Sequence, residues 1–402
     1  MARLSSRIND IVVAGKTGWE VHFAAMERRA RGEDILMCSI GDHDFATPEK
    51  SVEACVAAVR AGHHHYTDIP GLGRLRDRMA DLSTRSTGVA TTRANVIATI
   101  GGQGALFAAM LACLDPGDHA IVVAPYYATY PGTIRAAGGV LGVVETRAAD
   151  DFQPDRGELE AALRRNTRLL LINTPNNPTG AVYSRRTLEA IADFCRRHDL
   201  WLVSDEVYWT FAESGHPHIS PLSLPGMEER TFVVNSVSKS HGMTGWRVGW
   251  LRAPQMAIAR LADLGIVTTY GLTDFVSHAV ADAMEGDWGV AEIADRYRRR
   301  RAILREAFDG MNEVTVRGST GGMYVMLDIR AVEESGEAFA FDLLEAERLA
   351  VMPGESFGRA AAGHIRISLC QPEAELREAA GRLKRFVATR VPQRARTGRV
   401  KA

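Results

Sequence analysis

The chain has 402 residues, a formal net charge of −1, 46% hydrophobic residues and 24% charged residues. A chain of this length exceeds one simple core, so we expect two domains of unequal size. The near-neutral charge balance argues against nucleic acid as a partner, and no apolar run approaches the roughly 18–20 residues that cross a membrane. The five cysteines lack paired spacing and the N-terminus lacks a secretory signal, so we expect a cytoplasmic protein with reduced thiols.

The N-terminal part predicts a helix, a short strand and a second helix. Residues 21–30 are amphipathic, as in a helix, and the apolar residues 35–40 predict a strand that ends at Gly41. Thr47 before Pro48 is typical of a helix start with threonine as the N-cap, and this helix should end near residue 61. Taken alone, Gly41 is interpreted as a turn glycine.

Three consecutive histidines, residues 63–65, raise the question of a metal site. Adjacent residues do not share a helix face, and no cluster of acidic residues or cysteines accompanies them in the sequence. We therefore predict no metal.

A strand at residues 96–100 is followed by a glycine-rich turn and an apolar helix that should end near residue 114. Backbone N–H groups and the helix dipole bind phosphate in such an arrangement, although a plain tight turn is the alternative. The Gly-Lys-Ser/Thr ending of a Walker loop is missing, and no context for a dinucleotide is present. The predicted phosphate contacts are Gly102 and Gln103.

Strands and helices alternate from residue 139 to residue 211, which predicts a parallel sheet built from βαβ units. One predicted strand ends at the loop 173–180, whose Pro175 and Pro178 are candidates for cis peptide bonds. Another ends at Asp205. Ligands bind outside the carboxyl ends of such strands, and a buried aspartate there is costly unless it faces a cation. A helix cap is the alternative for Asp205.

A further apolar run, residues 231–234, leads to Lys239 among small hydroxyl residues. A lysine at a strand end can form a Schiff base if it is partly desolvated. An isolated Ser-Lys-Ser is more often a solvated loop.

The C-terminal part predicts a long helix over residues 285–311, a strand over 321–329, a helix over 339–349 and a strand over 364–369. The charge run Arg298–Arg301 is interpreted as a solvated helix face. The basic residues from 391 onward predict a frayed tail.

Several of these segments together resemble the class I aminotransferases, which are pyridoxal-5′-phosphate (PLP) enzymes of fold type I. The cofactor-lysine signature of that family is similar to Ser236-x-Ser-Lys239 followed by Gly245-Trp-Arg-x-Gly249. Further blocks match in order: Gly41-Asp-x-Asp-Phe45, Tyr66-x4-Gly71, Asn173-x-Pro-x-Asn-Pro-Thr-Gly180, Asp205-x-x-Tyr208 and Arg366. His43 departs from the pattern because the family usually has proline there, and the proline constraint on φ is lost.

The resemblance implies an α/β fold, with a large domain whose mostly parallel sheet is sandwiched by helices and a smaller α/β C-terminal domain. The expected division is an N-terminal arm and small-domain segment (1–45), a large PLP-binding domain (46–285), a small domain (286–390) and a tail (391–402).

The resemblance also implies the site. Lys239 would hold PLP and act as general base, Asp205 would face the pyridine nitrogen, and Tyr208 would bond the phenolic oxygen O3′; these three are the predicted catalytic residues. The remaining cofactor contacts would be Asn177 at O3′, Tyr127 stacked on the ring, and a phosphate set of Gly102, Gln103, Ser236 and Arg247, with Ser238 as a further candidate.

For the substrate, the resemblance implies that Arg366 binds the α-carboxylate, with Asn177 beside it, and that Gly41 lets the backbone approach. Taken alone, Arg366 would be a surface arginine. Tyr66 would reach the cofactor phosphate of a neighbouring subunit, which implies a homodimer with shared active sites; a plain core tyrosine is the alternative.

The implied function is a ping-pong transfer of an amino group from an L-amino acid to a 2-oxo acid. Phrases such as Trp19-Glu-Val-His22 and Ala362-Gly-His-Ile-Arg366 look more like the arginine–pyruvate transaminase branch, so we expect arginine or a broad range of donors, with pyruvate as acceptor. The alternatives are an aspartate or aromatic aminotransferase, a PLP-dependent carbon–sulfur β-lyase, and a PLP-binding module of a transcription regulator. The last would need a long N-terminal DNA-binding domain, for which the early start of the matching blocks leaves no room.

Overall fold

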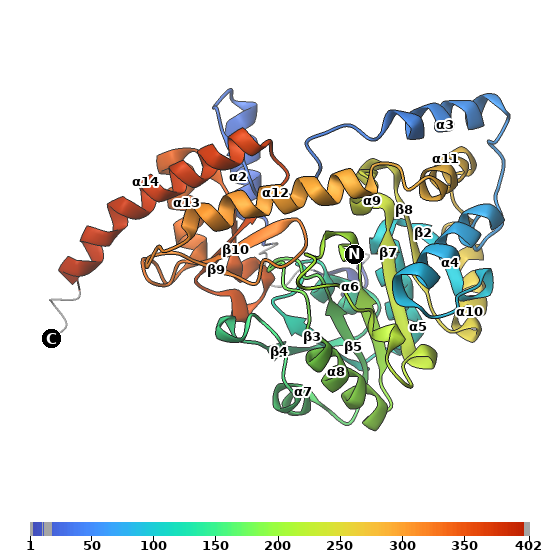
Figure 1. The fold of residues 1–402 in the computed structure, drawn as a ribbon. Helices are drawn as coiled ribbons and strands as arrows, with labels where there is room; N and C mark the ends of the chain where they lie inside the picture. Colours follow the sequence, from blue (N-terminus) through green and yellow to red (C-terminus); the bar gives the residue numbers. More distant parts are fainter. Residues whose placement is uncertain (1–2, 10, 12–17, 398–402) are drawn as a thin grey trace.

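The structure, a computed structural model, describes residues 3–9, 11 and 18–397, and two sheets organise it (Figure 1). The seven strands of the large sheet have the order β2-β8-β7-β6-β5-β3-β4. Their bounds are β2 (Val96–Ile100), β3 (His119–Ala124), β4 (Val140–Glu145), β5 (Thr167–Asn173), β6 (Trp201–Asp205), β7 (Thr231–Ser236) and β8 (Val248–Arg252). All neighbouring strands are parallel except β8, which is antiparallel to both β2 and β7. The predicted, mostly parallel sheet is confirmed.

Helices cover both faces of the large sheet because successive strand residues point to opposite sides. Val122 and Leu171 face α5 (Gly101–Cys113), α6 (Tyr130–Ala136) and α10 (Gln255–Ile266). Ile121 and Leu170 face α7 (Arg156–Ala162) and α8 (Arg185–Arg197). The β2–β8 end of that second face is covered by α4 (Gly73–Thr87) and α11 (Asp274–Glu285). Each large aliphatic side chain buried in this way contributes roughly 1.5–3 kcal/mol.

The small sheet lies beside the large one and is antiparallel, with the order β12-β13-β10-β9. Its strands are β9 (Thr315–Arg317), β10 (Tyr324–Asp328), β12 (Met352–Pro353) and β13 (His364–Ser368). The expected strand at 35–40 is reduced to β1 (Leu36–Met37), which pairs with β11 (Leu349–Ala350) and so joins the N-terminal segment to the C-terminal part. Helices α2 (Glu20–Ala30), α13 (Gly336–Glu347) and α14 (Glu373–Thr397) complete this part; the short α1 (Ser6–Asn9) lies near the N-terminus.

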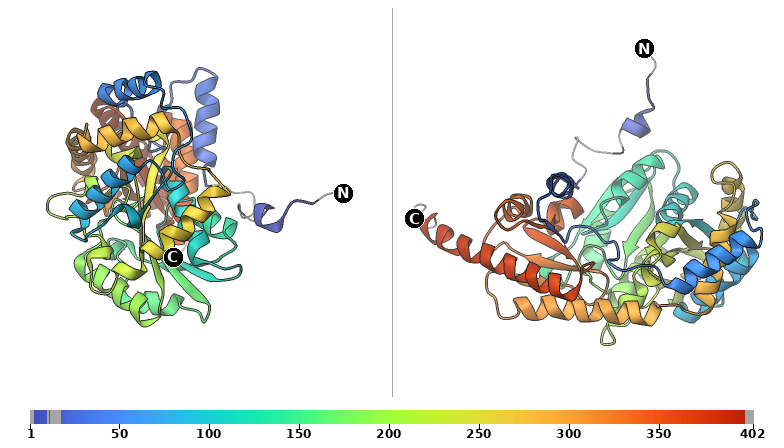
Figure 2. Two further views of the ribbon diagram at one scale, coloured as in Figure 1. Left: turned by 90° about the vertical axis from the view of Figure 1, so that its right-hand side faces the viewer. Right: turned by 90° about the horizontal axis from the view of Figure 1, so that it is seen from above.

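Helix α12 (Val290–Phe308) links the two sheets. The right-hand view in Figure 2 shows it along one side of the molecule, and it packs against α14 and reaches α9 (Val237–Ser240). It begins five residues later than predicted. The predicted tail is also partly wrong, because α14 continues to Thr397; residues 398–402 lie outside the described residues.

Two of the arginines on α12 correct the prediction of a solvated charge run. Arg300 and Arg301 are only 3% and 0% exposed. Arg300 forms a two-pronged ion pair with Asp44, both N–O distances being 2.7 Å. Arg301 donates to the carbonyl of Gly322 at 2.7 Å and to Glu213 at 3.0 Å. A buried guanidinium is tolerated only with such partners, and sequence spacing alone does not reveal them.

The predicted N-cap at Thr47 is wrong as well. Helix α3 (Glu49–Arg60) begins after Pro48 without a side-chain cap, and the Thr47 hydroxyl instead donates to the carbonyl of Gly242 at 2.8 Å. The threonine therefore ties its loop to the segment that follows Lys239.

All five cysteines are free, as predicted. Among the described residues, no helix combines the length and the apolar character that crossing a membrane requires.

Candidate active site

A cavity of about 490 Å³ lies where the carboxyl ends of β5, β6 and β7 meet the small sheet. Ligands of open α/β sheets bind at this edge. Every predicted site residue except Tyr66 lines the cavity, and Tyr130, Tyr324, Trp19 and Asp42 line it in addition.

Lys239 lies on the one-turn helix α9, directly after β7. The Ser236 hydroxyl caps this turn by accepting from the N–H of Ser238 at 3.1 Å. The Lys239 Nζ donates to the Gly41 carbonyl at 2.6 Å. Loss of solvation in the cavity lowers the pKa of this amine, and the Arg247 and Arg366 guanidinium groups act in the same direction. An amine with a lowered pKa can release its proton closer to neutral pH.

Asp205 ends β6 and is 4% exposed. The Tyr130 hydroxyl donates to its Oδ2 at 2.7 Å, and the Val207 N–H donates to its Oδ1 at 3.3 Å. Burial raises the pKa of this carboxyl group to about 6. Because no cationic side chain of the described residues pairs with it, Asp205 is suited to accept a hydrogen bond from a positively charged ligand.

Arg366, on β13, is 1% exposed. Its Nη1 donates to the Asn177 Oδ1 at 2.7 Å and its Nη2 donates to the Ser39 carbonyl at 2.6 Å. The guanidinium carbon lies 4.1 Å from the ring centre of Tyr324 and 4.6 Å from that of Phe357. Within the described part of the chain no carboxylate pairs with Arg366, so this planar fork can bind the carboxylate of a ligand.

The loop that carries Asn177 contains both of the predicted cis peptide bonds. The peptide bonds before Pro175 and Pro178 are both cis, and a third cis bond precedes Pro125. The Asn177 Nδ2 donates to the Tyr208 hydroxyl at 3.5 Å, so the amide connects Tyr208 with Arg366.

The part of the cavity that is lined by Gly102, Gln103 and Arg247 suits an anion. Gly102 lies in the first turn of the thirteen-residue helix α5, whose N–H groups and dipole favour negative charge. Gly101 has φ +65°, and a Cβ there would lie 2.1 Å from the Arg247 Nη2, so the close approach of this arginine requires glycine. The Gln103 side chain is held by α6, since its Nε2 donates to Thr133 at 2.8 Å.

Sequence reasoning missed the contributions of Tyr130 and Tyr324. The Tyr130 hydroxyl donates to Asp205, which lies 75 residues away in the chain. Tyr324 packs edge-on against Tyr208, and a Cβ on Gly41 would lie 1.9 Å from its hydroxyl oxygen. Gly41 is therefore needed for this close approach. No local signal in the sequence could have identified these partners.

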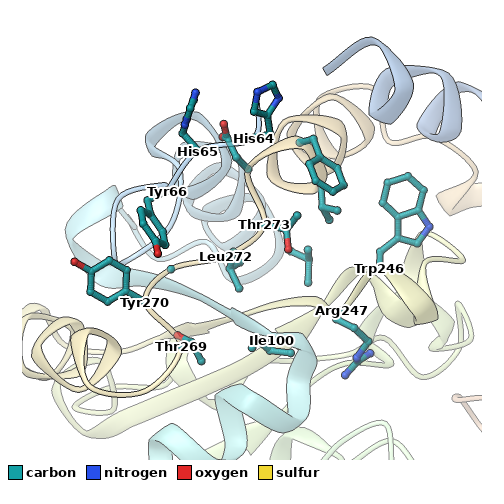
Figure 3. A pocket seen from close by; sticks show the side chains of 15 residues that line it. His64, His65, Tyr66, Ile100, Trp246, Arg247, Thr269, Tyr270, Leu272 and Thr273 are labelled. Carbon is teal, nitrogen blue, oxygen red and sulfur yellow. The ribbon is translucent and has the colours of Figure 1, made fainter. Parts of the chain in front are cut away.

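Tyr66 lies outside the Lys239 cavity. It is 84% exposed and packs edge-on against Tyr270, with ring centres 5.0 Å apart. Both tyrosines line a second cavity of about 630 Å³, and Figure 3 shows them across that cavity from Arg247. Because Arg247 also lines the first cavity, the two adjoin there.

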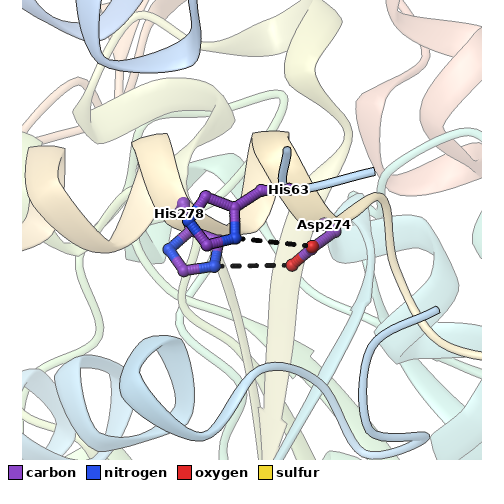
Figure 4. Close-up of side chains that lie close together, drawn as sticks. All are labelled: His63, Asp274 and His278. Carbon is purple, nitrogen blue, oxygen red and sulfur yellow. Dashed lines mark ion pairs between the residues drawn. The ribbon is translucent and has the colours of Figure 1, made fainter. Parts of the chain in front are cut away.

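His63 is the one residue of the histidine run that meets possible metal ligands, Asp274 and His278 (Figure 4). The imidazole nitrogens of His63 and His278 lie 3.8 and 3.5 Å from the Asp274 carboxylate. The two rings are stacked, with centres 3.7 Å apart and planes 27° apart. A metal ion lies in the plane of each imidazole that binds it, and rings stacked in this way do not direct their nitrogens at one common point. We interpret the cluster as a contact between the segment that follows α3 and α11.

Nearly the whole chain is similar in sequence to known proteins. The sequence profile of the family "Aminotransferase class I and II" matches residues 33–383. An arginine–pyruvate transaminase of Pseudomonas aeruginosa is 40% identical over 382 residues, which are 95% of this chain and 97% of that protein. An aspartate/prephenate aminotransferase of Thermus thermophilus is 38% identical over 371 residues, 91% of this chain and 94% of that protein.

Solved structures agree. An aspartate aminotransferase from Thermus thermophilus with maleate superposes with a TM-score of 0.89 at 36% identity, covering 96% of this chain and all of that one. An aromatic aminotransferase from Pyrococcus horikoshii superposes with a TM-score of 0.86 at 33% identity, covering 91% of this chain and 99% of that one. The chain therefore belongs to the class I and II aminotransferases.

Proposed function

We propose that this aminotransferase uses PLP and moves an amino group from arginine, or from a broad range of L-amino acids, to pyruvate. The observation that carries the proposal is the convergence of the Lys239 amine, the Asp205 carboxylate and the Arg366 guanidinium on one cavity. Each is a charged or ionisable group that lacks an oppositely charged side chain as partner within the described residues.

The residues present fit the cofactor. Asp205 would hold the pyridine nitrogen, because a carboxylate whose pKa is raised by burial is stabilised by a cationic N–H. Asn177 and Tyr208 would bind O3′, Tyr127 would cover the ring, and the start of α5 with Ser236 and Arg247 would bind the phosphate. Bound PLP supplies an electron sink for the carbanion formed at the substrate Cα.

The protein side chains then divide the remaining work. Arg366 binds the substrate carboxylate and so orients the Cα–H bond. The Lys239 amine removes the Cα proton of the donor, and in the second half of the reaction it returns a proton to the Cα of the new amino acid. Its lowered pKa favours this role. The Tyr130 hydroxyl and the Val207 N–H hold the Asp205 carboxylate in place.

The proposed donor is supported by the 40% identity to the arginine–pyruvate transaminase. Asp42 lines the cavity and accepts from the Thr244 hydroxyl at 2.7 Å, so an acidic group is available for a basic donor side chain. The relatives above are aminotransferases by name, which gives no support to a carbon–sulfur lyase.

The test is a donor and acceptor panel on the purified protein. L-Arginine, L-aspartate and an aromatic amino acid are each assayed with pyruvate and with 2-oxoglutarate. We expect turnover of arginine with pyruvate; activity confined to aspartate with 2-oxoglutarate would contradict the proposed donor. Lys239→Ala should abolish turnover and the covalent attachment of the added cofactor, whereas Lys50→Ala, at an exposed position, should change neither.

We further propose a homodimer in which Tyr66 serves the cavity of the neighbouring subunit. Its exposure and its position away from the Lys239 cavity support this proposal. Subunits carrying Lys239→Ala and subunits carrying Tyr66→Phe should complement one another. Random mixing makes half of the dimers hybrid, each with one intact site, so about one quarter of wild-type activity should return. Unchanged activity of the separate Tyr66→Phe protein would contradict the assignment.

A further inference from the structure

The loop of residues 41–47 is fastened to the segment of residues 238–246 at several points. The hydroxyl of Thr244 donates to Asp42 and the hydroxyl of Thr47 donates to the Gly242 carbonyl. The loop is therefore held against the lysine segment on both sides of His43, the residue that departs from the aminotransferase pattern.

The His43 ring is held at both nitrogens. Its Nε2 lies 3.2 Å from the Ser238 carbonyl oxygen, and its Nδ1 lies 2.8 Å from the Tyr297 hydroxyl. A carbonyl oxygen only accepts, so Nε2 carries the proton and Nδ1 is an acceptor. The Tyr297 hydroxyl is then shared between this nitrogen and the Cys370 Sγ, which lies 3.4 Å away. The ring also packs against Phe45, with centres 4.7 Å apart. These contacts define one tautomer and one orientation for a neutral imidazole.

The Ser238 carbonyl needs a donor from outside its own helix. Helix α9 has four residues, and a helix that short leaves most of its carbonyl groups without an intrahelical donor. His43 supplies the donor to the peptide group that directly precedes Lys239. A proline at this position, as in the enzymes that the chain resembles, has no side-chain donor.

We infer that His43 is a positioning residue: through its Nε2–H it holds the Ser238–Lys239 peptide and fixes the direction from which the Lys239 amine reaches its target. This inference rests on the proposed role of Lys239. Gly41, two residues earlier, accepts from the Lys239 Nζ, so the same loop holds both the backbone and the amine of the lysine.

The charges around His43 favour its neutral form. Burial lowers the pKa of His43 to about 4, and Lys239 acts in the same direction, against smaller opposite effects of the hydrogen bond to the Ser238 carbonyl and of Asp42 and Asp44. Asp44 is paired with Arg300, which limits its effect. The charged and titratable groups that act on the ring are Asp42 and Asp44 of its own loop, Lys239 of α9 and Tyr297 of α12. Behind them, Arg296 lies over the Phe45 ring, Arg300 pairs with Asp44, and Cys370 contacts the Tyr297 hydroxyl. We therefore expect the tautomer to persist across the neutral pH range.

Three variants of His43 distinguish the effect of its Nε2–H donor from the effect of the size of its side chain. His43→Gln places an amide N–H near the position of Nε2, whereas His43→Asn reaches only the position of Nδ1, and His43→Pro restores the usual residue of the family. The control is His216→Gln, the same change at an exposed site. The readouts on the PLP-loaded proteins are kcat, KM for the donor, and the pH midpoint at which the visible absorption changes.

We expect His43→Asn and His43→Pro to lower kcat about 5- to 10-fold with KM changed less than about 2-fold. The absorption midpoint should rise by about half a pH unit or more, because the Lys239 nitrogen, which would carry the cofactor in the loaded protein, gains solvation when the segment loosens and is more readily protonated. His43→Gln and His216→Gln should remain within about 0.2 pH unit of wild type.

Two results would overturn the inference: a wild-type midpoint in both His43→Asn and His43→Pro, or a midpoint in His43→Gln shifted as far as in His43→Asn. If His43→Pro does not fold, the Gln and Asn pair decides alone. Absence of any visible band in the loaded wild-type protein would overturn the proposed function itself, and so is distinguishable from a failure of the His43 assignment.

Discussion

Replacing Asp205 with asparagine should stabilise the cofactor-free protein while destroying its activity. Burial raises the pKa of this carboxyl group from 3.8 to about 6, which means that the folded state disfavours the charged form. At about 1.4 kcal/mol per unit, ionised Asp205 costs the folded state about 3 kcal/mol. This cost is absent below pH 3.8, grows as the pH rises through about 6, and is complete at pH 8. Asparagine has a similar shape and removes the charge.

Urea unfolding of the cofactor-free proteins at pH 4.5 and pH 8 tests the reasoning. The stability advantage of Asp205→Asn over wild type should grow by about 2 kcal/mol between the two pH values. Asp309→Asn, a change at an exposed aspartate, should show no such growth. Saturation with PLP should reverse the order, because the cation then lies beside the wild-type carboxylate. An advantage that is independent of pH, or a variant less stable than wild type at pH 8, would refute the electrostatic argument.

Three further predictions concern the guanidinium groups and Gly41. Arg366→Lys removes the planar fork and should raise KM for the donor about 10- to 100-fold without changing the absorption of bound cofactor; an unchanged KM in steady-state kinetics would contradict the assignment. Arg301→Met removes hydrogen bonds to buried oxygens and should lower the free energy of unfolding by about 3 kcal/mol. Arg298→Met, at an exposed ion pair, should lower it by less than about 1 kcal/mol in the same urea titration. Equal effects of the two variants would show that burial is not the cause. Gly41→Ala should lower kcat/KM at least about tenfold because its Cβ would lie 1.9 Å from the Tyr324 hydroxyl oxygen, and adding Tyr324→Phe should restore part of it; a double variant no better than the single one would count against the clash.

Two of the predicted site residues follow directly from the positions of strand ends. Asp205 and Lys239 each follow a short apolar run, and a parallel sheet brings the ends of such runs to one edge. Asn177 was predicted from its resemblance to a family motif, and the structure places it between Tyr208 and Arg366. Local pattern and topology located the strand ends, and the family resemblance was needed to assign these residues to a site.

The errors concern residues whose surroundings come from distant parts of the chain. Arg301 reads as solvated because it stands in a run of four arginines, yet its partners come from two other segments. Thr47 has the composition of an N-cap, but its hydroxyl has a partner 195 residues away. In each case a tertiary contact outweighed a local preference.

The loop of residues 41–47 has a consequence for how the enzyme comes into being. It closes on a lysine 198 residues further along, and the carbonyl of Ser39 bonds an arginine 327 residues further along. A nascent chain must therefore be almost finished at the ribosome before its reactive amine acquires the surroundings that tune it. Closures of this span are slow, so we expect catalytic competence to be the last property gained during biosynthesis.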